Sequence, residues 1–235
     1  MGALGEPPPQ PGSDGDEPFP AGLRDTFLEF ARPMRARKGQ IIVSEGTDNS
    51  DVYLIRAGRV RITILSAGGR EVILRDMGPD CLFGELAAID RLPRSASVVA
   101  LEPTQFAHMR GEDFLTFLGK VPQAGLWMAR QMAARVRDLT DRTFALATLP
   151  VASRVQAELL RLAMTPGGTI GSDGTVIIRP MPTHADMAAR VGTHREAVSR
   201  ELGLLAQEGL VKQSGRTLTI LSHTRLKQLN ARLRK

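Results

Sequence analysis

Residues 83–98 read Phe-Gly-Glu-Leu-Ala-Ala-Ile-Asp-Arg-Leu-Pro-Arg-Ser-Ala-Ser-Val, which sets one carboxylate, Glu85, and one guanidinium, Arg94, at the two ends of a short turn. Gly84 has no side chain that would hold a ligand away from the backbone. Arg94 can donate to two phosphate oxygens, Ser95 can donate a third hydrogen bond, and Glu85 remains to accept from hydroxyl groups. The stretch therefore predicts a site for a small anion, and a phosphate joined to a sugar hydroxyl satisfies these groups.

The chain around this stretch consists of short apolar and β-branched runs separated by glycines. The runs cover residues 40–43, 52–55, 60–65, 71–74 and 97–99. Short strands at regular spacing, with glycine at the corners, predict an antiparallel barrel or sandwich. Residues 59–64 alternate with the period of a half-buried strand, and residues 67–70 have the composition of a hairpin turn. The interior of such a barrel supplies the pocket.

Residues 83–96 resemble the phosphate-binding cassette of cyclic-nucleotide-binding domains, whose pattern is FGE(L/I)A followed by PR(S/T)A. The positions that this resemblance assigns to the nucleotide are Gly84, Glu85, Leu86, Arg94, Ser95 and Ala96. It implies that the first two contact the ribose 2′-hydroxyl, that the arginine and the serine hold the cyclic phosphate, and that Leu86 and Ala96 frame the pocket. The alternative is a buried Glu85–Arg94 ion pair that braces a β-turn.

Length and composition favour two domains. The chain has 235 residues, of which 42% are hydrophobic, but no apolar run approaches the roughly 20 residues that cross a bilayer. Residues 1–22 are rich in Pro, Gly, Asp and Glu and predict a disordered acidic tail rather than a secretory signal, so we expect a cytoplasmic protein without membrane partners. The single cysteine, Cys81, excludes an internal disulfide, and the four histidines have no metal-ligand spacing, so we expect no metal cofactor.

The basic charge is concentrated in the C-terminal third. Residues 151–235 hold 13 Lys and Arg against 6 Asp and Glu, a charge of +7, whereas the whole chain carries +6. Such a concentration is the electrostatic footprint of a nucleic-acid-binding domain. A solvated basic face or an acidic protein partner would have the same composition.

Residues 125–146 change to a helical pattern. A narrow apolar seam steps alternately by four and three residues through Gly125, Ala129, Met132, Val136, Leu139, Thr143 and Leu146. A seam of this period over three heptads predicts a coiled coil, and hence a homodimer. The alternative is a long amphipathic helix that packs on its own domain. The domain boundary falls near Pro150, with a hinge before it.

Residues 183–211 predict two helices around a sharp turn at Gly192. The spacings Thr183 to Asp186 and Thr193 to Glu196 are those of helix starts. A shared apolar core is provided by Met187, Ala188, Val191, Val198, Leu202 and Leu205. This is the pattern of a helix-turn-helix, whose second helix enters the major groove of DNA.

The second helix has an exposed face suited to reading base pairs. Arginine can bond guanine O6 and N7, and glutamate can accept from cytosine N4, so Arg195, Glu196 and Arg200 form a base-reading set. Candidate phosphate contacts are Thr193, His194 and Ser199, with Arg216 in a two-stranded wing over residues 211–220. Glu196 as a capping-box partner and Arg200 as a solvated helix charge are the alternatives.

With cassette, long helix and helix-turn-helix in this order, residues 23–222 resemble the CRP/FNR family of transcription regulators. The resemblance implies an α+β fold: an antiparallel cyclic-nucleotide-binding β-roll over residues 23–120, a dimerisation helix and hinge over 121–148, and a winged helix-turn-helix over 149–235. The stretch Arg-Glu-Ala-Val-Ser-Arg at residues 195–200 matches the receptor-type recognition helix and implies palindromic TGTGA-like sites in double-stranded DNA. RNA polymerase is the further partner that the family implies.

The predicted dimerisation helix departs from the pattern of the cyclic-AMP receptor proteins, one branch of the family that the chain resembles. A Thr-Ser pair that contacts the base in the receptor falls on Leu139 and Thr140 here. Thr140 keeps a hydroxyl, but Leu139 cannot donate, so cAMP and cGMP both remain candidate effectors. Ligand-independent members of the family, and a cyclic-nucleotide-binding protein that acts on a protein partner, are the rival functions. No pattern of an enzyme active site is present outside the cassette.

Overall fold

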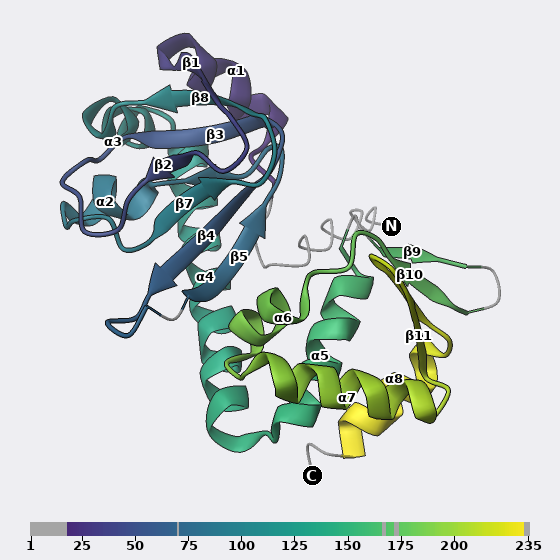
Figure 1. Cartoon of the computed structure of the whole chain (residues 1–235). Helices are drawn as coiled ribbons and strands as arrows, with labels where there is room; N and C mark the ends of the chain where they lie inside the picture. Colours follow the sequence, from purple (N-terminus) through teal and green to yellow (C-terminus); the bar gives the residue numbers. More distant parts are fainter. Residues whose placement is uncertain (1–17, 70, 166–167, 172–173, 233–235) are drawn as a thin grey trace, which may run out of the picture.

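The computed structural model describes residues 18–69, 71–165, 168–171 and 174–232. It contains an N-terminal β-roll, a long helix and a C-terminal helix-turn-helix domain (Figure 1). This confirms the predicted α+β fold. Residues 1–17, most of the expected acidic tail, lie outside the described part of the chain, as does Arg70 of the expected hairpin turn.

Two four-stranded antiparallel sheets form the roll. The first has the order β1-β8-β3-β6 and comprises Arg32–Ala36, Thr104–Met109, Val52–Ala57 and Leu82–Phe83. The second has the order β2-β7-β4-β5 and comprises Ile41–Val43, Ser97–Ala100, Val60–Leu65 and Glu71–Met77. Because side chains alternate between the two faces of a strand, each sheet contributes one apolar face to a shared core, which includes Ile55, Val98 and Phe106. The strands predicted from the glycine-punctuated runs are β2, β3, β4, β5 and β7.

Three helices cover one side of the first sheet. They are α1 (Ala21–Phe30), α3 (Gly111–Lys120) and the start of α4 (Pro122–Thr148). Phe19 is 1% exposed and packs edge to face on Phe27 and Trp127. The boundary expected at residue 22 therefore differs from the structure, in which an aromatic side chain before that residue already belongs to the core.

Helix α4 is longer than the predicted seam by one turn or less at each end. Its first half packs on the roll through Ala124, Trp127, Met128 and Gln131, which are buried. Its second half exposes apolar side chains: Val136 is 62% exposed, Leu139 56% and Leu146 54%. One helix therefore contributes a buried face to the roll in its first half and an exposed apolar seam in its second half.

The C-terminal domain packs four helices against a small sheet. The helices are α5 (Val151–Ala163), α6 (His184–Val191), α7 (Arg195–Gln207) and α8 (His223–Arg232). The sheet has the order β11-β12-β10-β9 and comprises Val211–Ser214, Thr217–Ile220, Val176–Ile178 and Gly168–Ile170. All six residues predicted as the helix-turn-helix core are buried: Met187, Ala188, Val191, Val198, Leu202 and Leu205. Strands β11 and β12 form the predicted wing, with Gly215 and Arg216 at its turn.

Candidate functional site

The cassette lines a cavity of about 100 Å³ in the roll. It contributes the six residues singled out in the sequence, namely Gly84, Glu85, Leu86, Arg94, Ser95 and Ala96. Strands β4 and β5 add Ile62, Leu74 and Arg75, and helix α4 adds Arg135. Short helix α2 (Glu85–Asp90) begins inside the cassette, so its first backbone N–H groups lie beside the same cavity.

Arg94 is held almost entirely by backbone and amide oxygens. Its side chain donates from Nη1 to the Gly84 carbonyl at 2.8 Å and from Nη2 to the Asp51 carbonyl at 2.6 Å. A further bond joins Nη2 to Asn49 Oδ1 at 2.5 Å. Burial lowers the pKa of the guanidinium, although the nearby Tyr53, Asp51 and Glu85 act in the opposite direction. Arg94 is therefore an immobilised cation and not a flexible surface charge.

Gly84 is required by the shape of this turn. Its φ is +89°, in the left-handed region that side chains other than glycine rarely adopt. An added Cβ would lie 2.6 Å from the Asp51 carbonyl oxygen and 2.8 Å from Arg94 Nη1. Because Gly84 has no side chain, the guanidinium of Arg94 fits inside the turn. The sequence predicted instead that this space serves the approach of a ligand.

Glu85 contacts Arg135 of α4, and the sequence did not predict this pair. The carboxylate is 3% exposed and accepts from Arg135 Nη1 through Oε1. The predicted alternative, a Glu85–Arg94 pair that braces the turn, is not the arrangement found, since Glu85 faces the long helix and Arg94 faces backbone oxygens. The contact ties the cassette directly to α4.

The lining of the cavity combines an excess of positive charge with one carboxylate. Three guanidinium groups, of Arg75, Arg94 and Arg135, line it together with a single carboxylate. Glu85 Oε2 and Arg94 Nε are both buried, and neither has a hydrogen-bond partner within the described part of the chain. A buried polar atom without a partner carries a free-energy cost that a ligand can relieve. One unpaired acceptor beside one unpaired cationic donor fits a sugar hydroxyl next to a phosphate.

Thr140 differs from the six cassette residues. It is exposed on α4, its hydroxyl donates to the Val136 carbonyl at 2.9 Å, and it stands outside the residues that line the cavity. Arg135, five residues earlier on α4, lines the cavity. At 1.5 Å of rise per residue, five residues displace a side chain by about 7.5 Å along a helix. Arg75 on β5 was also missed, because an arginine in an alternating strand has no local signal that separates a lining residue from a surface charge.

The predicted DNA-reading face lies on α7. Arg195, Glu196, Ser199 and Arg200 are all exposed there, and His194 and Arg216 are exposed at the helix start and the wing turn. Thr193 is half-buried. Ser199 Oγ lies 2.8 Å from His184 Nδ1 and donates to the Arg195 carbonyl at 3.1 Å, so this predicted phosphate contact also ties α7 to α6. The structure therefore leaves the predicted set, apart from the half-buried Thr193, exposed on the surface of the domain.

The start of α7 differs by one residue from the prediction. Thr183 caps α6 as expected, accepting from the Asp186 N–H at 3.0 Å. Helix α7, however, has His194 as its N-cap, so Glu196 is the second helical residue and does not occupy the third position of a capping box. The reason is that the Thr193 N–H bonds back to the Ala188 carbonyl at 3.0 Å and closes the turn after α6. The carboxylate of Glu196 still lies at the positive end of the helix dipole.

Neither metal binding nor membrane insertion is indicated by the described residues. They contain no group of three or more His, Cys, Asp or Glu side chains that could hold a metal ion. No helix among them is long and apolar enough to span a bilayer.

Comparison with known proteins assigns the two halves of the chain. The family model of the cyclic nucleotide-binding domain matches residues 33–120, and that of the Crp-like helix-turn-helix domain matches residues 153–229. The cyclic AMP receptor protein of Thermus thermophilus is 32% identical over 205 residues, which cover 87% of this chain and 91% of that protein. The CRP-like cAMP-activated global transcriptional regulator of Mycobacterium tuberculosis is 28% identical over 195 residues, which cover 83% of this chain and 86% of that protein.

Among solved structures, a CooA mutant from Carboxydothermus hydrogenoformans has the same fold. The TM-score is 0.78 at 21% identity, with 92% of this chain and 96% of that chain covered. Together with the cassette and the helix-turn-helix, these matches show that the chain belongs to the CRP/FNR family of cyclic-nucleotide-binding transcription regulators, which are DNA-binding proteins and not enzymes.

Proposed function

We propose that this chain is a cytoplasmic, homodimeric transcription regulator whose affinity for DNA depends on a cyclic mononucleotide bound in the roll. The observation that carries the proposal is the pair of buried atoms without a partner in the described residues, Arg94 Nε and Glu85 Oε2, in a cavity with excess positive charge. In this proposal residues 23–120 form the nucleotide-binding domain, 121–148 the dimerisation helix and 149–235 the DNA-binding domain.

The nucleotide contacts follow from these groups. The cyclic phosphate accepts from Arg94 Nε and from Ser95, and the ribose 2′-hydroxyl donates to Glu85 Oε2. Gly84 keeps the turn compact, and Leu86 and Ala96 bound the pocket. Because Glu85 also contacts Arg135, a ribose hydroxyl at this carboxylate meets the dimer helix through that arginine.

Two bases, adenine and guanine, are candidates for the nucleotide. We propose cAMP as the first candidate, because the Thermus relative is named a cyclic AMP receptor protein. The second candidate is cGMP: Arg75 lines the cavity, a guanidinium can bond both O6 and N7 of guanine, and Leu139 offers no polar group to adenine. Thr140 remains a candidate base contact in the dimer, where a second copy of α4 would lie beside the first.

The dimer is supported by the apolar seam of α4. Val136, Leu139 and Leu146 are more than half exposed in the single chain, at heptad spacing. Exposed side chains with this period are buried when two copies of the helix pair. A two-fold axis along α4 would place two copies of α7 about 34 Å apart, the spacing of successive major-groove half-sites.

DNA reading is assigned to the exposed end of α7. Arg195, Glu196 and Arg200 would contact base edges of a TGTGA-like half-site. Thr193, His194, Ser199 and Arg216 would contact the phosphate backbone. RNA polymerase is the proposed protein partner of the DNA-bound dimer. A regulator that acts only on a protein partner is the less supported function, since it leaves the exposed base-reading set without a role.

The test measures ligand and DNA in the same preparation. The full-length protein is titrated with cAMP and with cGMP by calorimetry. The binding of a TGTGA palindrome and of a scrambled duplex is then measured at fixed salt, with and without each nucleotide. Saturable binding of one nucleotide that tightens the palindrome complex supports the proposal. Absence of binding by both nucleotides overturns the ligand half of the proposal, and equal affinity for both duplexes overturns the half that concerns DNA sequence.

A further inference from the structure

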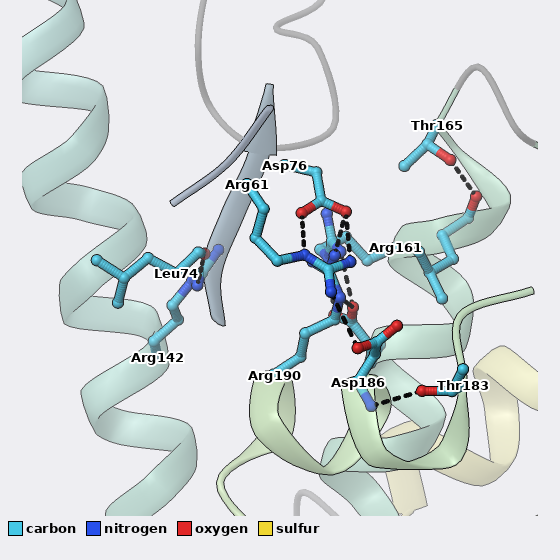
Figure 2. A network of polar contacts seen from close by, with 11 residues as sticks. Arg61, Leu74, Asp76, Arg142, Arg161, Thr165, Thr183, Asp186 and Arg190 are labelled. Atoms are coloured by element: carbon cyan, nitrogen blue, oxygen red, sulfur yellow. Dashed lines mark hydrogen bonds and ion pairs between the residues drawn. The ribbon is translucent and has the colours of Figure 1, made fainter. Parts of the chain in front are cut away.

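A cluster of four charged side chains joins the roll to the helix-turn-helix domain (Figure 2). Arg61 of β4 donates from Nε and Nη2 to the two carboxylate oxygens of Asp76 on β5, at 2.8 and 3.1 Å. The third nitrogen of Arg61, Nη1, donates to Asp186 of α6 at 2.9 Å. Arg190 of α6 donates to Asp76 Oδ2. We call Arg61, Asp76, Asp186 and Arg190 the roll–HTH cluster.

Three members of the roll–HTH cluster are largely shielded from solvent, unlike an ordinary surface ion pair, and the fourth, Asp186, is 28% exposed. Arg190 is 6% exposed, Asp76 12% and Arg61 15%, whereas Arg110 in the pair Arg110–Asp113 is 72% exposed. Burial alone raises the pKa of the Asp76 carboxyl, but hydrogen bonds from Arg61 and the charge of Arg190 outweigh it and hold the pKa below its usual value. Solvent-exposed pairs contribute little to structure because water and salt screen them, and these charges are screened much less.

Asp76 stands on the strand that also lines the nucleotide cavity. Leu74 and Arg75, the two residues before it on β5, both line the cavity. The Leu74 carbonyl accepts from Arg142 of α4 at 2.5 Å (Figure 2). Three consecutive residues of one extended strand therefore contact the cavity, the dimer helix and the helix-turn-helix domain. A displacement of the strand at the cavity moves the carboxylate that holds α6.

The position of α6 determines the position of α7. Met187 and Val191 of α6 share one buried core with Val198 and Leu202 of α7, and His184 contacts Ser199 across the pair. Behind α6, Arg190 approaches Glu158 of α5 at 3.8 Å, which links the cluster to the rest of the domain. Because α6 and α7 are tightly packed against each other, a movement of α6 also moves α7.

We propose that Asp76 is a positioning residue that couples the nucleotide cavity to the DNA-reading helix. Its ion pairs with Arg61 and Arg190 fix the orientation of α6, and hence of α7, relative to the roll. A change at the cavity end of β5 is then transmitted to DNA through this carboxylate, in addition to any change in the dimer helix. This inference rests on the proposed function, because it describes how the same cavity affects DNA affinity.

The test measures the coupling between nucleotide binding and DNA binding, because a purely structural role of Asp76 would leave this coupling unchanged. The quantity is the ratio of palindrome Kd without and with the nucleotide that the wild-type protein binds, in full-length wild type, Asp76→Asn and Asp113→Asn. Couplings of this kind are typically about 5- to 150-fold. We expect Asp76→Asn to lower the ratio severalfold, leaving only the part transmitted by the dimer helix, and Asp113→Asn, in the exposed pair, to leave it at the wild-type value. By thermodynamic reciprocity, the effect of DNA on nucleotide affinity falls by the same factor.

Further variants separate coupling from folding. Arg190→Gln removes the other side of the same pair and is used if Asp76→Asn is unfolded by circular dichroism. The double variant is expected to lose no more coupling than either single variant. A wild-type ratio in folded Asp76→Asn or Arg190→Gln overturns the inference and leaves the proposed function intact. A wild-type protein in which neither cAMP nor cGMP alters DNA affinity overturns the proposed function, and this inference with it.

Discussion

The cavity of the roll and the exposed face of α7 both present arginines, but they hold them differently. Arg94 is 4% exposed and bonded to three oxygens through its two Nη atoms, whereas Arg195 is exposed at the first turn of its helix. A side chain that is already ordered loses little conformational entropy when it binds, and an exposed one must be ordered by its partner. The proposed nucleotide site is therefore preorganised by the fold, while the proposed DNA-reading face depends on DNA to order it.

This difference has consequences for substitution. A buried guanidinium contributes both to folding and to binding, because its removal leaves backbone carbonyls without donors. An exposed guanidinium contributes mainly to the complex. The four predictions below test this contrast in order of decreasing expected effect.

The largest effect is expected for Arg94→Ala. The variant should lose nucleotide affinity by up to about 100-fold, because the hydrogen bond from Nε to the charged phosphate contributes up to about 3 kcal/mol and each 1.4 kcal/mol is tenfold. It should also unfold at lower urea concentration, since the carbonyls of Gly84 and Asp51 lose a buried donor. Calorimetry and urea titration measure the two effects.

Two variants control for this experiment. Arg56→Ala removes an exposed arginine of β3 in the same roll and should change neither quantity. Ser95→Ala tests the phosphate contact without disturbing the carbonyl bonds of Arg94. Wild-type nucleotide affinity in Arg94→Ala would contradict the preorganised site.

The second-largest effect is expected for Gly84→Ala. The backbone has φ +89°, and the new Cβ would lie 2.6 Å from the Asp51 carbonyl oxygen, so the turn must shift. We expect a loss of about 2 kcal/mol or more in stability, together with weaker nucleotide binding. Gly119→Ala in α3 is the matched control, because nothing lies within 4 Å of its added Cβ. Equal thermal midpoints for the two variants would show that the turn tolerates a side chain.

Arg195→Ala should affect DNA binding alone. We expect a loss of about 1 to 3 kcal/mol in discrimination between the palindrome and a base-substituted duplex, with unchanged nucleotide affinity and thermal stability. Fluorescence anisotropy with both duplexes at one salt concentration measures the difference. Arg225→Ala, on α8, serves as the control. If Arg195→Ala weakens both duplexes equally, the residue contacts phosphate and does not read a base.

The smallest effect concerns Asp76, which lies between the two regions. Its pKa is below the unfolded value, so its ion pairs stabilise the protein fully above about pH 5 and this stabilisation is lost as the pH falls through the folded pKa. Stability measured by urea unfolding should therefore fall more between pH 6 and pH 3 in wild type than in Asp76→Asn. Parallel curves for the two proteins would mean that Asp76 has an ordinary pKa.

The fold and most of the cassette could be predicted because their signals are local. Glycine-punctuated β-branched runs, the heptad seam of α4 and the buried apolar set of α6 and α7 each depend on residues near one another in the chain. Gly84 and Arg94 are ten positions apart and meet in a single turn. The one-residue difference at the start of α7 arose from a bond between Thr193 and Ala188, which competes with the capping pattern.

What the sequence alone determined is the order of the modules, the chemistry of the cassette and the charge and face of the reading helix, since periodicity and short motifs encode these directly. Only the tertiary structure decided that Glu85 meets Arg135 of α4, that Arg75 lines the cavity, and that Asp76 bonds to Arg190 from 114 positions away. The reason is physical: a lone charged residue on a strand or helix has no local signature for its partner. Its pairing is set by which elements the cores bring together, and those contacts span the whole chain.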